Sequence, residues 1–342
     1  MKTLTQRGRR AIAPVLLQAA LALSANADTT DLDQVLAAAT TLAKSDHTGA
    51  LEGALFLCQD FAAASRHIMS FEKSLPATRV FDNLYFVGTE FVGVWILNTS
   101  EGYILFDAMG NSVEAAKHIV GGFSALGLDP NRIRYVVVTH GHWDHFGGAR
   151  YLQARFGAKV LMGKADWQLL DQLDEQGPEL MGQRPPKVDF AVSGPVDLTL
   201  GDTKVYLMAT PGHSPGTVSA LIPVRDGGAS HQLALWGGTA IPPTLEPSRP
   251  DSDHSWRHQG LTQYRESLHS FRQWAVSRGA DGVISTHPFS ENTSGRLARV
   301  AARQPDDAHP FVIGGKGVDR YFMVIDYCAQ ALKIRTGQGE VR

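Results

Sequence analysis

The chain has 342 residues, of which 43% are hydrophobic and 19% charged, so it can bury a full core without relying on metal or disulfides to fold. This balance excludes collagen-like, coiled-coil and disordered proteins. Residues 1–27 carry four positive charges and no acid, so the rest of the chain has a net charge of −6, which argues against nucleic acid as its main partner.

Residues 1–27 have the features of a secretory signal peptide. Four basic residues lie within the first ten positions, an apolar stretch of 13 residues runs from Ala11 to Leu23, and Ala25-Asn26-Ala27 is a small-x-small cleavage pattern. The apolar stretch is too short to anchor the chain in a bilayer. We therefore expect cleavage after Ala27 and a periplasmic or secreted protein without a membrane anchor, exported by the general or the twin-arginine route. An ordinary N-terminal helix is the alternative.

The chain contains two cysteines, Cys58 and Cys328. In an oxidising compartment they could form one bridge between an N-terminal segment and a C-terminal helix. Two buried free thiols are the alternative, because the sequence does not show whether the two side chains meet.

The first half of the chain is predicted to begin with helices and then to alternate between strands and helices. Apolar residues recur at helical spacing over residues 31–70, where a second helix covers about Leu51–Met69. The elements predicted after them are strands Val80–Val87, Val92–Asn98, Tyr103–Asp107, Tyr135–Val138 and Lys159–Met162, and helices Ser112–Ala125 and Ala149–Phe156. The β-branched run Tyr135–Val138 is typical of a strand buried on both faces.

The second half continues this alternation. We predict strands at Asp197–Leu200, Lys204–Ala209, Thr217–Val224, Gln232–Trp236 and Gly282–Ser285, and helices at Leu261–Arg278, Glu291–Arg303 and Val318–Ile334. Strands with interspersed helices in both halves indicate an α/β protein, an αββα sandwich in which two stacked sheets are covered by helices on the outside.

A cluster of metal-ligating residues directly follows the strand Tyr135–Val138. His140 and His142 are two apart in an extended segment, so both side chains point the same way and can bind one ion. Asp144 and His145 are adjacent, so at least one of them is directed elsewhere, toward a second metal position about 3.5–4 Å away. A polar loop of unrelated histidines is the alternative interpretation.

Glycines at positions 141, 147 and 148 surround this cluster. We expect them to let the backbone turn sharply without the steric penalty of a Cβ atom.

Two further histidines follow predicted strands. His213 lies in the loop Thr210–Gly216 after Lys204–Ala209, and His287 lies in Ser285-Thr286-His287-Pro288 after a second strand. A lone histidine in such a place is more often a capped or surface residue. Because both loops are stiffened by glycine or proline and follow the first cluster, we predict that both histidines are metal ligands.

The order and approximate spacing of these motifs resemble the metallo-β-lactamase superfamily over about Val80 to Pro288. The most similar branch is the third subclass of zinc-dependent β-lactamases. The resemblance implies two zinc ions per chain, and its ligand sets correspond here to His140, His142 and His213 for one ion and Asp144, His145 and His287 for the other. It also implies three parts, namely the signal peptide 1–27, a helical extension 28–75 and a metallo-β-lactamase-fold hydrolase domain 76–342.

The segment after Gln232–Trp236 separates the branches of this superfamily. Glyoxalase II and the acyl-homoserine lactonases have a metal-bridging aspartate there, and the first two β-lactamase subclasses have a cysteine. This chain has Gly237-Gly238-Thr239-Ala240, with neither residue. The third subclass commonly has serines there that help to hold the substrate carboxylate, and here only Thr239 has a hydroxyl.

Several residues near these motifs have open roles. Asp107 resembles the superfamily's strand-end aspartate beneath the metals, where it would orient a ligand histidine, but it could equally cap a turn. His254, Trp256 and His258 could line the substrate groove or lie on the surface.

The Gly-x-Ser-x-Gly pattern at 212–216 would suit a serine esterase, but that nucleophile needs a following helix and a strand is predicted there.

The resemblance implies a secreted binuclear zinc hydrolase that acts on a small molecule. The expected reaction is opening of a β-lactam ring by a metal-bound hydroxide that Asp144 orients, without a covalent acyl-enzyme. Another hydrolase that uses the same site on an ester, lactone or amide is the first alternative, and a metal-binding module without catalysis is the second.

Overall fold

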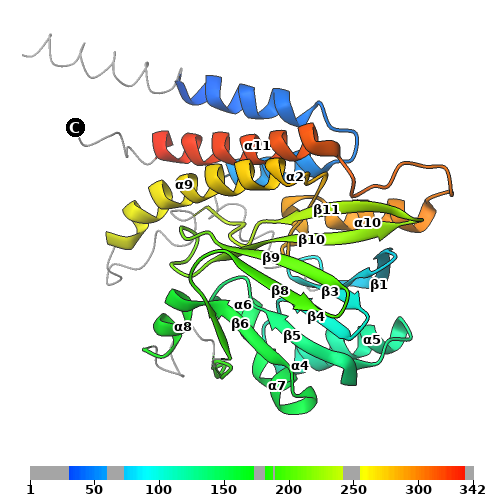
Figure 1. The fold of residues 1–342 in the computed structure, drawn as a ribbon. Helices are drawn as coiled ribbons and strands as arrows, with labels where there is room; N and C mark the ends of the chain where they lie inside the picture. The colour runs from blue at the N-terminus through cyan, green and yellow to red at the C-terminus, as the bar shows by residue number, and fades with distance from the viewer. Residues whose placement is uncertain (1–30, 60–72, 173–181, 188, 242–254, 336–342) are drawn as a thin grey trace, which may run out of the picture.

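The computed structural model describes residues 31–59, 73–172, 182–187, 189–241 and 255–335, with side chains from residue 260 onward in the last range. Two β-sheets lie face to face, with helices on both outer sides (Figure 1). The αββα sandwich predicted from the sequence is therefore confirmed. The proposed signal peptide lies outside the described residues, so cleavage after Ala27 stays a prediction.

The larger sheet has seven strands in chain order. The strands are β1 (Ser74–Phe81), β2 (Leu84–Thr89), β3 (Gly93–Thr99), β4 (Gly102–Phe106), β5 (Ile133–Val137), β6 (Lys159–Gly163) and β7 (Phe190–Val192). The first four pair antiparallel, and β4 to β7 pair parallel.

The prediction of one strand over Val80–Val87 was wrong, because β1 ends at Phe81 and β2 begins at Leu84. The side chain of Asn83 accepts a hydrogen bond from the backbone of Arg225 and donates one to the carbonyl of Pro223. Asparagine is common in such tight turns, and these two bonds attach this turn to the second sheet.

The second sheet has five strands in the order β12-β11-β10-β9-β8. The strands are β8 (Val196–Leu200), β9 (Thr203–Ala209), β10 (Val218–Asp226), β11 (Ala229–Leu235) and β12 (Gly282–Ile284). Only the pair of β11 and β12 is parallel. Strand β12 pairs with β11, and the loop that carries His287 follows the carboxyl end of β12. This loop therefore lies at the same edge of the sandwich as the loops that follow β5 and β9.

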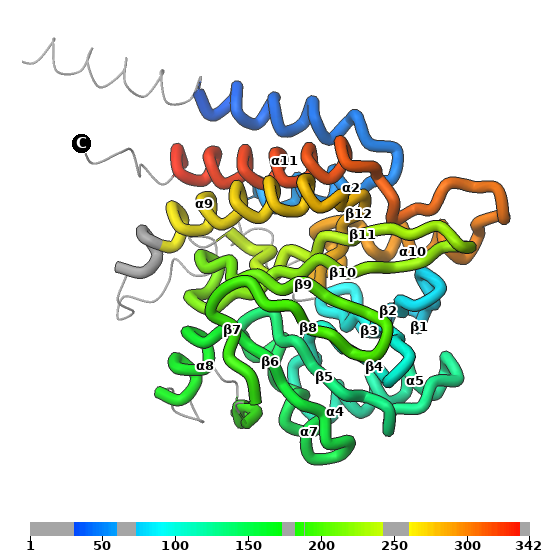
Figure 2. Tube along the Cα trace, in the orientation of Figure 1, coloured from blue at the N-terminus to red at the C-terminus, as the bar shows by residue number. Residues whose placement is uncertain are grey.

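Helices cover the outer face of each sheet (Figures 1 and 2). One continuous helical stretch, made of α4 (Ser112–Glu114), η2 (Ala115–Val120) and α5 (Gly121–Ala125), lies on the larger sheet with α7 (Ala149–Phe156) and α8 (Lys164–Leu170). The smaller sheet is covered by α2 (Ala50–Ala54), η1 (Leu55–Cys58), α9 (Ser255–Ser277) and α11 (Gly314–Arg335), and the helix of residues 31–43 lies against α11 on the same side. The other helical segments are η3 (Pro130–Arg132), α6 (Trp143–Phe146), η5 (Pro288–Ser290) and α10 (Thr293–Ala302). Within the described ranges, no helix combines the length and apolar character needed to cross a bilayer.

The core between the sheets is apolar and contains large aromatic side chains. Phe86, Trp95 and Phe106 of the larger sheet pack against residues of the smaller sheet such as Ile222. The buried Trp95 ring also donates a hydrogen bond from Nε1 to the carbonyl oxygen of Ser285, at 2.8 Å. Strand β3 is thereby attached to the loop that carries His287.

The N-terminal helical segments share a core with the rest of the protein. Residues 31–43 run alongside α11 in Figures 1 and 2, and Ala39 and Ala43 are fully buried in the same apolar cluster as Leu221 and Trp236. Of the predicted second helix, α2 and η1 are described, and residues 60–72 lie outside the described ranges. The division of the chain after residue 75 stays a prediction.

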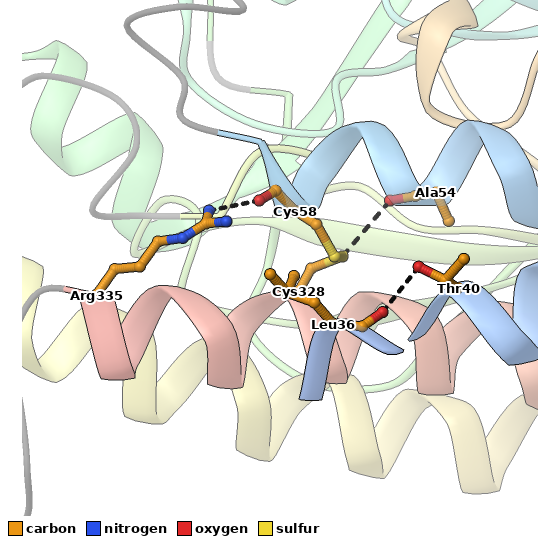
Figure 3. Close-up of a disulfide and its surroundings, with 6 residues drawn as sticks. All are labelled: Leu36, Thr40, Ala54, Cys58, Cys328 and Arg335. Carbon is orange, nitrogen blue, oxygen red and sulfur yellow. Dashed lines mark hydrogen bonds between the residues drawn. A yellow bond between two sulfur atoms is a disulfide. The ribbon is translucent and has the colours of Figure 1, made fainter. Parts of the chain in front are cut away.

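A disulfide joins η1 to α11. Cys58 and Cys328 are bonded across a sequence separation of 270 residues, and Arg335 donates a hydrogen bond to the carbonyl oxygen of Cys58 (Figure 3). The structure thus decides between the two alternatives for the cysteines in favour of the bridge. The bond fastens the N-terminal segment to the C-terminal helix.

Replacing both cysteines by alanine is expected to lower the free energy of unfolding by about 2–5 kcal/mol, because a bridge that closes so long a loop restricts the unfolded chain. Urea unfolding of wild type and the double variant, with and without reductant, measures the difference. Reductant should weaken only the wild type. Equal urea midpoints for both oxidised proteins would contradict the expectation.

His309 is held neutral in the interior. Its Nε2 donates to the carbonyl oxygen of Val80, its Nδ1 accepts from the backbone N–H of Phe311, and its ring stacks on Phe81 at 3.8 Å between centroids. Burial lowers the pKa of His309 to about 4, against smaller opposite effects of the bond to Val80 and of Asp226.

Between pH 6.5 and 4 the unfolded chain therefore binds a proton at His309 that the folded protein does not bind, and stability falls as the pH decreases through this window. Between pH 7 and pH 5, the free energy of unfolding of wild type should fall by on the order of 1 kcal/mol more than that of His309→Asn. Urea unfolding of both proteins at the two pH values tests this. Equal losses would show that His309 does not contribute.

Candidate metal centre

Loops from both sheets converge at one edge of the sandwich. His140 follows β5, and the short helix α6 that comes next contains Asp144 and His145. His213 follows β9 and His287 follows β12. The carboxyl ends of these strands bring together residues that lie far apart in the sequence.

The first group of three side chains consists of His140, His142 and His213, here called the three-histidine group. Nε2 of His213 lies 3.0 Å from Nε2 of His140 and 3.1 Å from Nδ1 of His142. Three ring nitrogens thus face one point.

The second group consists of Asp144, His145 and His287, here called the aspartate group. Nε2 of His145 lies 3.0 Å from Nε2 of His287 and 3.3 Å from Oδ2 of Asp144. The same carboxylate oxygen lies 3.6 Å from Nε2 of His287. The rings of His140 and His145 are 3.9 Å apart between centroids, so the two groups are neighbours.

The spacing of these atoms suits metal ions. Ligand nitrogens about 2.0–2.1 Å from a tetrahedral zinc lie about 3.3 Å from one another. The distances within the two groups, from 3.0 to 3.6 Å, bracket that value. Each group could therefore hold one metal ion with three protein ligands, which leaves a fourth position open.

Hydrogen bonds on the far side of the rings orient the lone pairs. Nδ1 of His213 donates to the carbonyl oxygen of Ala240 at 2.6 Å, and Nδ1 of His287 donates to that of Phe91 at 2.8 Å. Since a neutral imidazole has one proton, these bonds leave Nε2 of both rings as an acceptor that faces its group.

Asp107 orients two more rings. Its Oδ2 accepts from Nδ1 of His145 at 2.6 Å and from the hydroxyl of Thr139 at 2.9 Å. The Thr139 hydroxyl has thus used its proton, so it accepts from Nδ1 of His140 at 3.0 Å. Of the two roles considered for Asp107, the geometry favours orientation of a histidine, and it reaches a histidine in each group.

The four histidines other than His145 are neutral at neutral pH. Burial lowers the pKa values of His140 and His213 well below the usual value, and those of His142 and His287 to about 4. A neutral imidazole is the form that binds a metal, so no proton needs to leave these rings.

His145 and Asp144 form a coupled pair. Burial would lower the pKa of His145, but the carboxylates of Asp144 and Asp107 raise it to about 10. Burial would raise the pKa of Asp144, but His145 and then His287 lower it below its ordinary value. Asp144 is therefore ionised, and a metal that binds the aspartate group must displace a proton from Nε2 of His145.

An aromatic cluster borders the aspartate group. The rings of Phe91 and Phe289 lie 5.2 and 5.1 Å from that of His287 between centroids, and Phe56 lies 4.9 Å from Phe289. These half-buried phenylalanines come from the β2–β3 connection, η5 and η1. They place an apolar surface beside His287.

The glycines around the His140–His145 cluster are not explained by sharp turns of the backbone, as was expected. None of Gly141, Gly147 and Gly148 has a positive φ angle. Instead, a Cβ atom on Gly147 would lie 1.9 Å from the carbonyl oxygen of Gly110, and one on Gly148 would lie 2.2 Å from that of Ala108. Close approach of neighbouring backbone, rather than a sharp turn, requires glycine at both positions.

The hydroxyls of Thr239 and Ser214 are hydrogen-bonded within the protein. The Thr239 hydroxyl is buried and shares a hydrogen bond of 2.8 Å with Ser285, whose hydroxyl accepts from the backbone of His287. Ser214 is buried as well, and β10 rather than a helix follows it, so the turn that a serine esterase needs is absent here.

Three residues of open role lie outside what the structure describes. These are His254 and the side chains of Trp256 and His258.

Sequence reasoning missed several groups that hold the candidate ligands in place. The carbonyl oxygens of Phe91 and Ala240 carry no signal in the side-chain pattern, because any residue offers a carbonyl. Asp166 of α8, which contacts the loops of the three-histidine group, was also missed. An acidic residue three positions after the end of β6, a strand that neighbours β5, was the only available sign.

Comparison with known proteins agrees with this geometry. Residues 87–226 match the family model of the metallo-beta-lactamase superfamily. A hydroxyacylglutathione hydrolase of Acidiphilium cryptum is 36% identical over 90 residues, which are 26% of this chain and 31% of that protein. The chain thus spans about a third of the length of this curated relative.

Solved structures match over a larger share of the chain. BJP-1, a subclass B3 metallo-beta-lactamase of Bradyrhizobium japonicum, has a TM-score of 0.62 and 28% identity, and the match covers 79% of this chain and 99% of that one. FEZ-1, a metallo-beta-lactamase from Legionella gormanii, has a TM-score of 0.65 at 19% identity, with 78% and 98% covered, which supports the fold alone. The chain therefore contains a metallo-β-lactamase superfamily domain, and subclass B3 metallo-β-lactamases are its structural neighbours.

Proposed function

We propose that this chain is a secreted binuclear zinc β-lactamase that opens the β-lactam ring of a small-molecule substrate with water. The observation that carries the proposal is the pair of adjacent three-ligand groups, in which hydrogen bonds from behind orient the rings of His140, His145, His213 and His287. Three protein ligands per ion are typical of catalytic zinc sites, whereas structural sites have four.

Zinc suits the donor set because imidazole nitrogens and a carboxylate oxygen are among its preferred ligands. Bound in the two groups, zinc would supply a Lewis acid for the substrate carbonyl and would lower the pKa of a coordinated water to about 7. His140, His142 and His213 would hold one ion, and Asp144, His145 and His287 the other.

The chain's own residues would orient the reactants. Asp144 is ionised, and its carboxylate can hold a water molecule by accepting a hydrogen bond, in addition to binding a metal. The aromatic surface of Phe91 and Phe289 beside His287 would exclude bulk water and contact the apolar part of a substrate. None of these steps requires a covalent acyl-enzyme.

The second candidate is a hydrolase of thioesters, since the curated relatives include hydroxyacylglutathione hydrolases. The segment Gly237–Ala240 argues against this candidate, because it has no carboxylate where glyoxalase II has a metal-bridging aspartate. The match to BJP-1 over nearly its whole length favours the β-lactamase.

The disulfide supports export. Structural disulfides persist in oxidising compartments such as the bacterial periplasm and are rare in the cytosol. Together with the basic and apolar N-terminal segment, it favours a periplasmic or secreted protein.

Zinc-loaded protein is expected to hydrolyse nitrocefin and penicillin, and a chelator should abolish this activity until zinc is restored. The same preparation is assayed on a hydroxyacylglutathione thioester as the matched alternative substrate. Metal analysis in parallel should give two zinc ions per chain. Zinc-loaded protein that leaves both β-lactams intact refutes the proposed function, and hydrolysis of the thioester alone would select the second candidate.

A further inference from the structure

A buried carboxylate lies between the two loops that carry the three-histidine group. Asp166 is in the first turn of α8, and its side chain is fully buried. A buried carboxylate is costly unless hydrogen bonds compensate for the loss of water, so the donors around it show what it contributes to the fold.

Three donors from two separate loops converge on Asp166. Its Oδ2 accepts from the backbone N–H of Gly141 and from the hydroxyl of Ser214, both at 2.7 Å. Its Oδ1 accepts from the backbone N–H of Gly216 at 2.6 Å. Hydrogen bonds to a charged acceptor are about twice as strong as neutral ones, so this carboxylate is a firm link between the loops.

These donors are next to the ligands in the chain. Gly141 lies between His140 and His142, and Ser214 directly follows His213. The carboxylate thus restrains the backbone between His140 and His142 directly, and it restrains the His213 loop through the Ser214 hydroxyl and the backbone N–H of Gly216. The aspartate group is held from elsewhere, by Asp107 and by the backbone carbonyl of Phe91.

Close packing keeps α8 against the His213 loop. A Cβ atom on Gly216 would lie 2.4 Å from the backbone nitrogen of Asp166, and one on Gly163 would lie 1.7 Å from the carbonyl oxygen of Gly216. Both positions therefore require glycine for the loop to come this near. The short aspartate side chain then reaches both loops, which a glutamate, longer by one methylene, would push apart.

We propose that Asp166 is a positioning residue that sets the separation of the His213 loop from the His140–His142 loop and thereby the metal affinity of the three-histidine group, but not that of the aspartate group. This inference rests on the proposed function, since it concerns metal binding at the same centre. Asp166 touches no ligand side chain in the hydrogen bonds described, so it acts through the loops that carry the ligands.

The test uses two single-site backgrounds of the full-length protein. His287→Ala leaves only the three-histidine group complete, and His213→Ala leaves only the aspartate group complete. Asp166→Asn is added to each, because an amide keeps the size of the side chain but turns one acceptor into a donor that faces other donors. Zinc affinity is measured by competition with a chromophoric chelator.

In the His287→Ala background, Asp166→Asn is expected to raise the Kd for zinc about 10–100-fold, the usual effect of losing a residue that orients ligands. In the His213→Ala background the Kd should change less than about threefold, because the change lies outside that group. Ser214→Ala, which removes one of the three donors, should raise the first Kd about tenfold or less. This milder variant decides the question if Asp166→Asn does not fold.

The outcomes separate this inference from the proposed function. Unchanged zinc affinity in the His287→Ala background overturns it, and so does equal weakening in both backgrounds, which indicates a general structural role. Protein that binds zinc with the expected selectivity but leaves β-lactams intact refutes the function and supports the positioning role. Absence of zinc binding by the His287→Ala parent overturns both.

Discussion

His213→Ala is expected to lower the rate of β-lactam hydrolysis about 10³-fold, since a Lewis-acidic metal contributes several kcal/mol to catalysis and each 1.36 kcal/mol corresponds to a factor of ten. The variant leaves His140 and His142 as the only members of their group. Two protein ligands hold zinc weakly, so the measured zinc content should fall from two ions per chain toward one. Activity on nitrocefin and zinc content are measured on the same preparation.

The fold should survive this change. The His213 ring is buried, but among the described residues its one hydrogen bond outside the two candidate ligand groups is the bond to the carbonyl oxygen of Ala240. His269→Ala serves as the matched control, because His269 lies half-exposed on α9 beside Asp326, away from the centre. Wild-type turnover by His213→Ala at full zinc content would remove this residue from the ligand group.

Much of this candidate centre was predictable because the residues proposed as its ligands are close in sequence or follow recognisable strands. His140, His142, Asp144 and His145 lie in one short motif, so local geometry alone directs them to one place. His213 and His287 were predictable because each follows a strand. The two strands, β9 and β12, run in the same direction in the smaller sheet, so their carboxyl ends lie at the same edge. The sandwich architecture followed from the alternation of strands and helices.

The features that could not be predicted depend on contacts between distant segments. The pairing of Cys58 with Cys328 requires that η1 lie beside α11, and sequence periodicity says nothing of such docking. The strand β7 has only three residues and is too short for a periodic pattern. Thr239 was considered as a substrate contact, but it is hydrogen-bonded to Ser285, which becomes its neighbour only through the parallel pairing of β11 and β12.

Asp107 is the residue whose loss should affect both ligand groups at once. Its carboxylate accepts from the backbone N–H of Thr139 at 2.7 Å, from the Thr139 hydroxyl and from Nδ1 of His145. The backbone of Asp107 itself is left-handed, with a φ of 68°, a conformation that costs an aspartate free energy and persists only when its surroundings enforce it. The three hydrogen bonds explain why an aspartate occupies this position rather than a glycine.

Asp107→Asn is expected to lower β-lactam hydrolysis about 10²-fold or more, since each lost orienting contact typically costs 10–100-fold in metal affinity or activity. An asparagine amide would present a donor to His145 or to Thr139, so the His145 ring would turn or change its tautomer. Without a carboxylate to accept its proton, the Thr139 hydroxyl would no longer be held as the acceptor for Nδ1 of His140. The zinc affinity should fall in both the His287→Ala and the His213→Ala backgrounds, in contrast to the selective effect expected for Asp166→Asn. Retention of wild-type zinc affinity in both backgrounds would mean that Asp107 only caps the turn after β4.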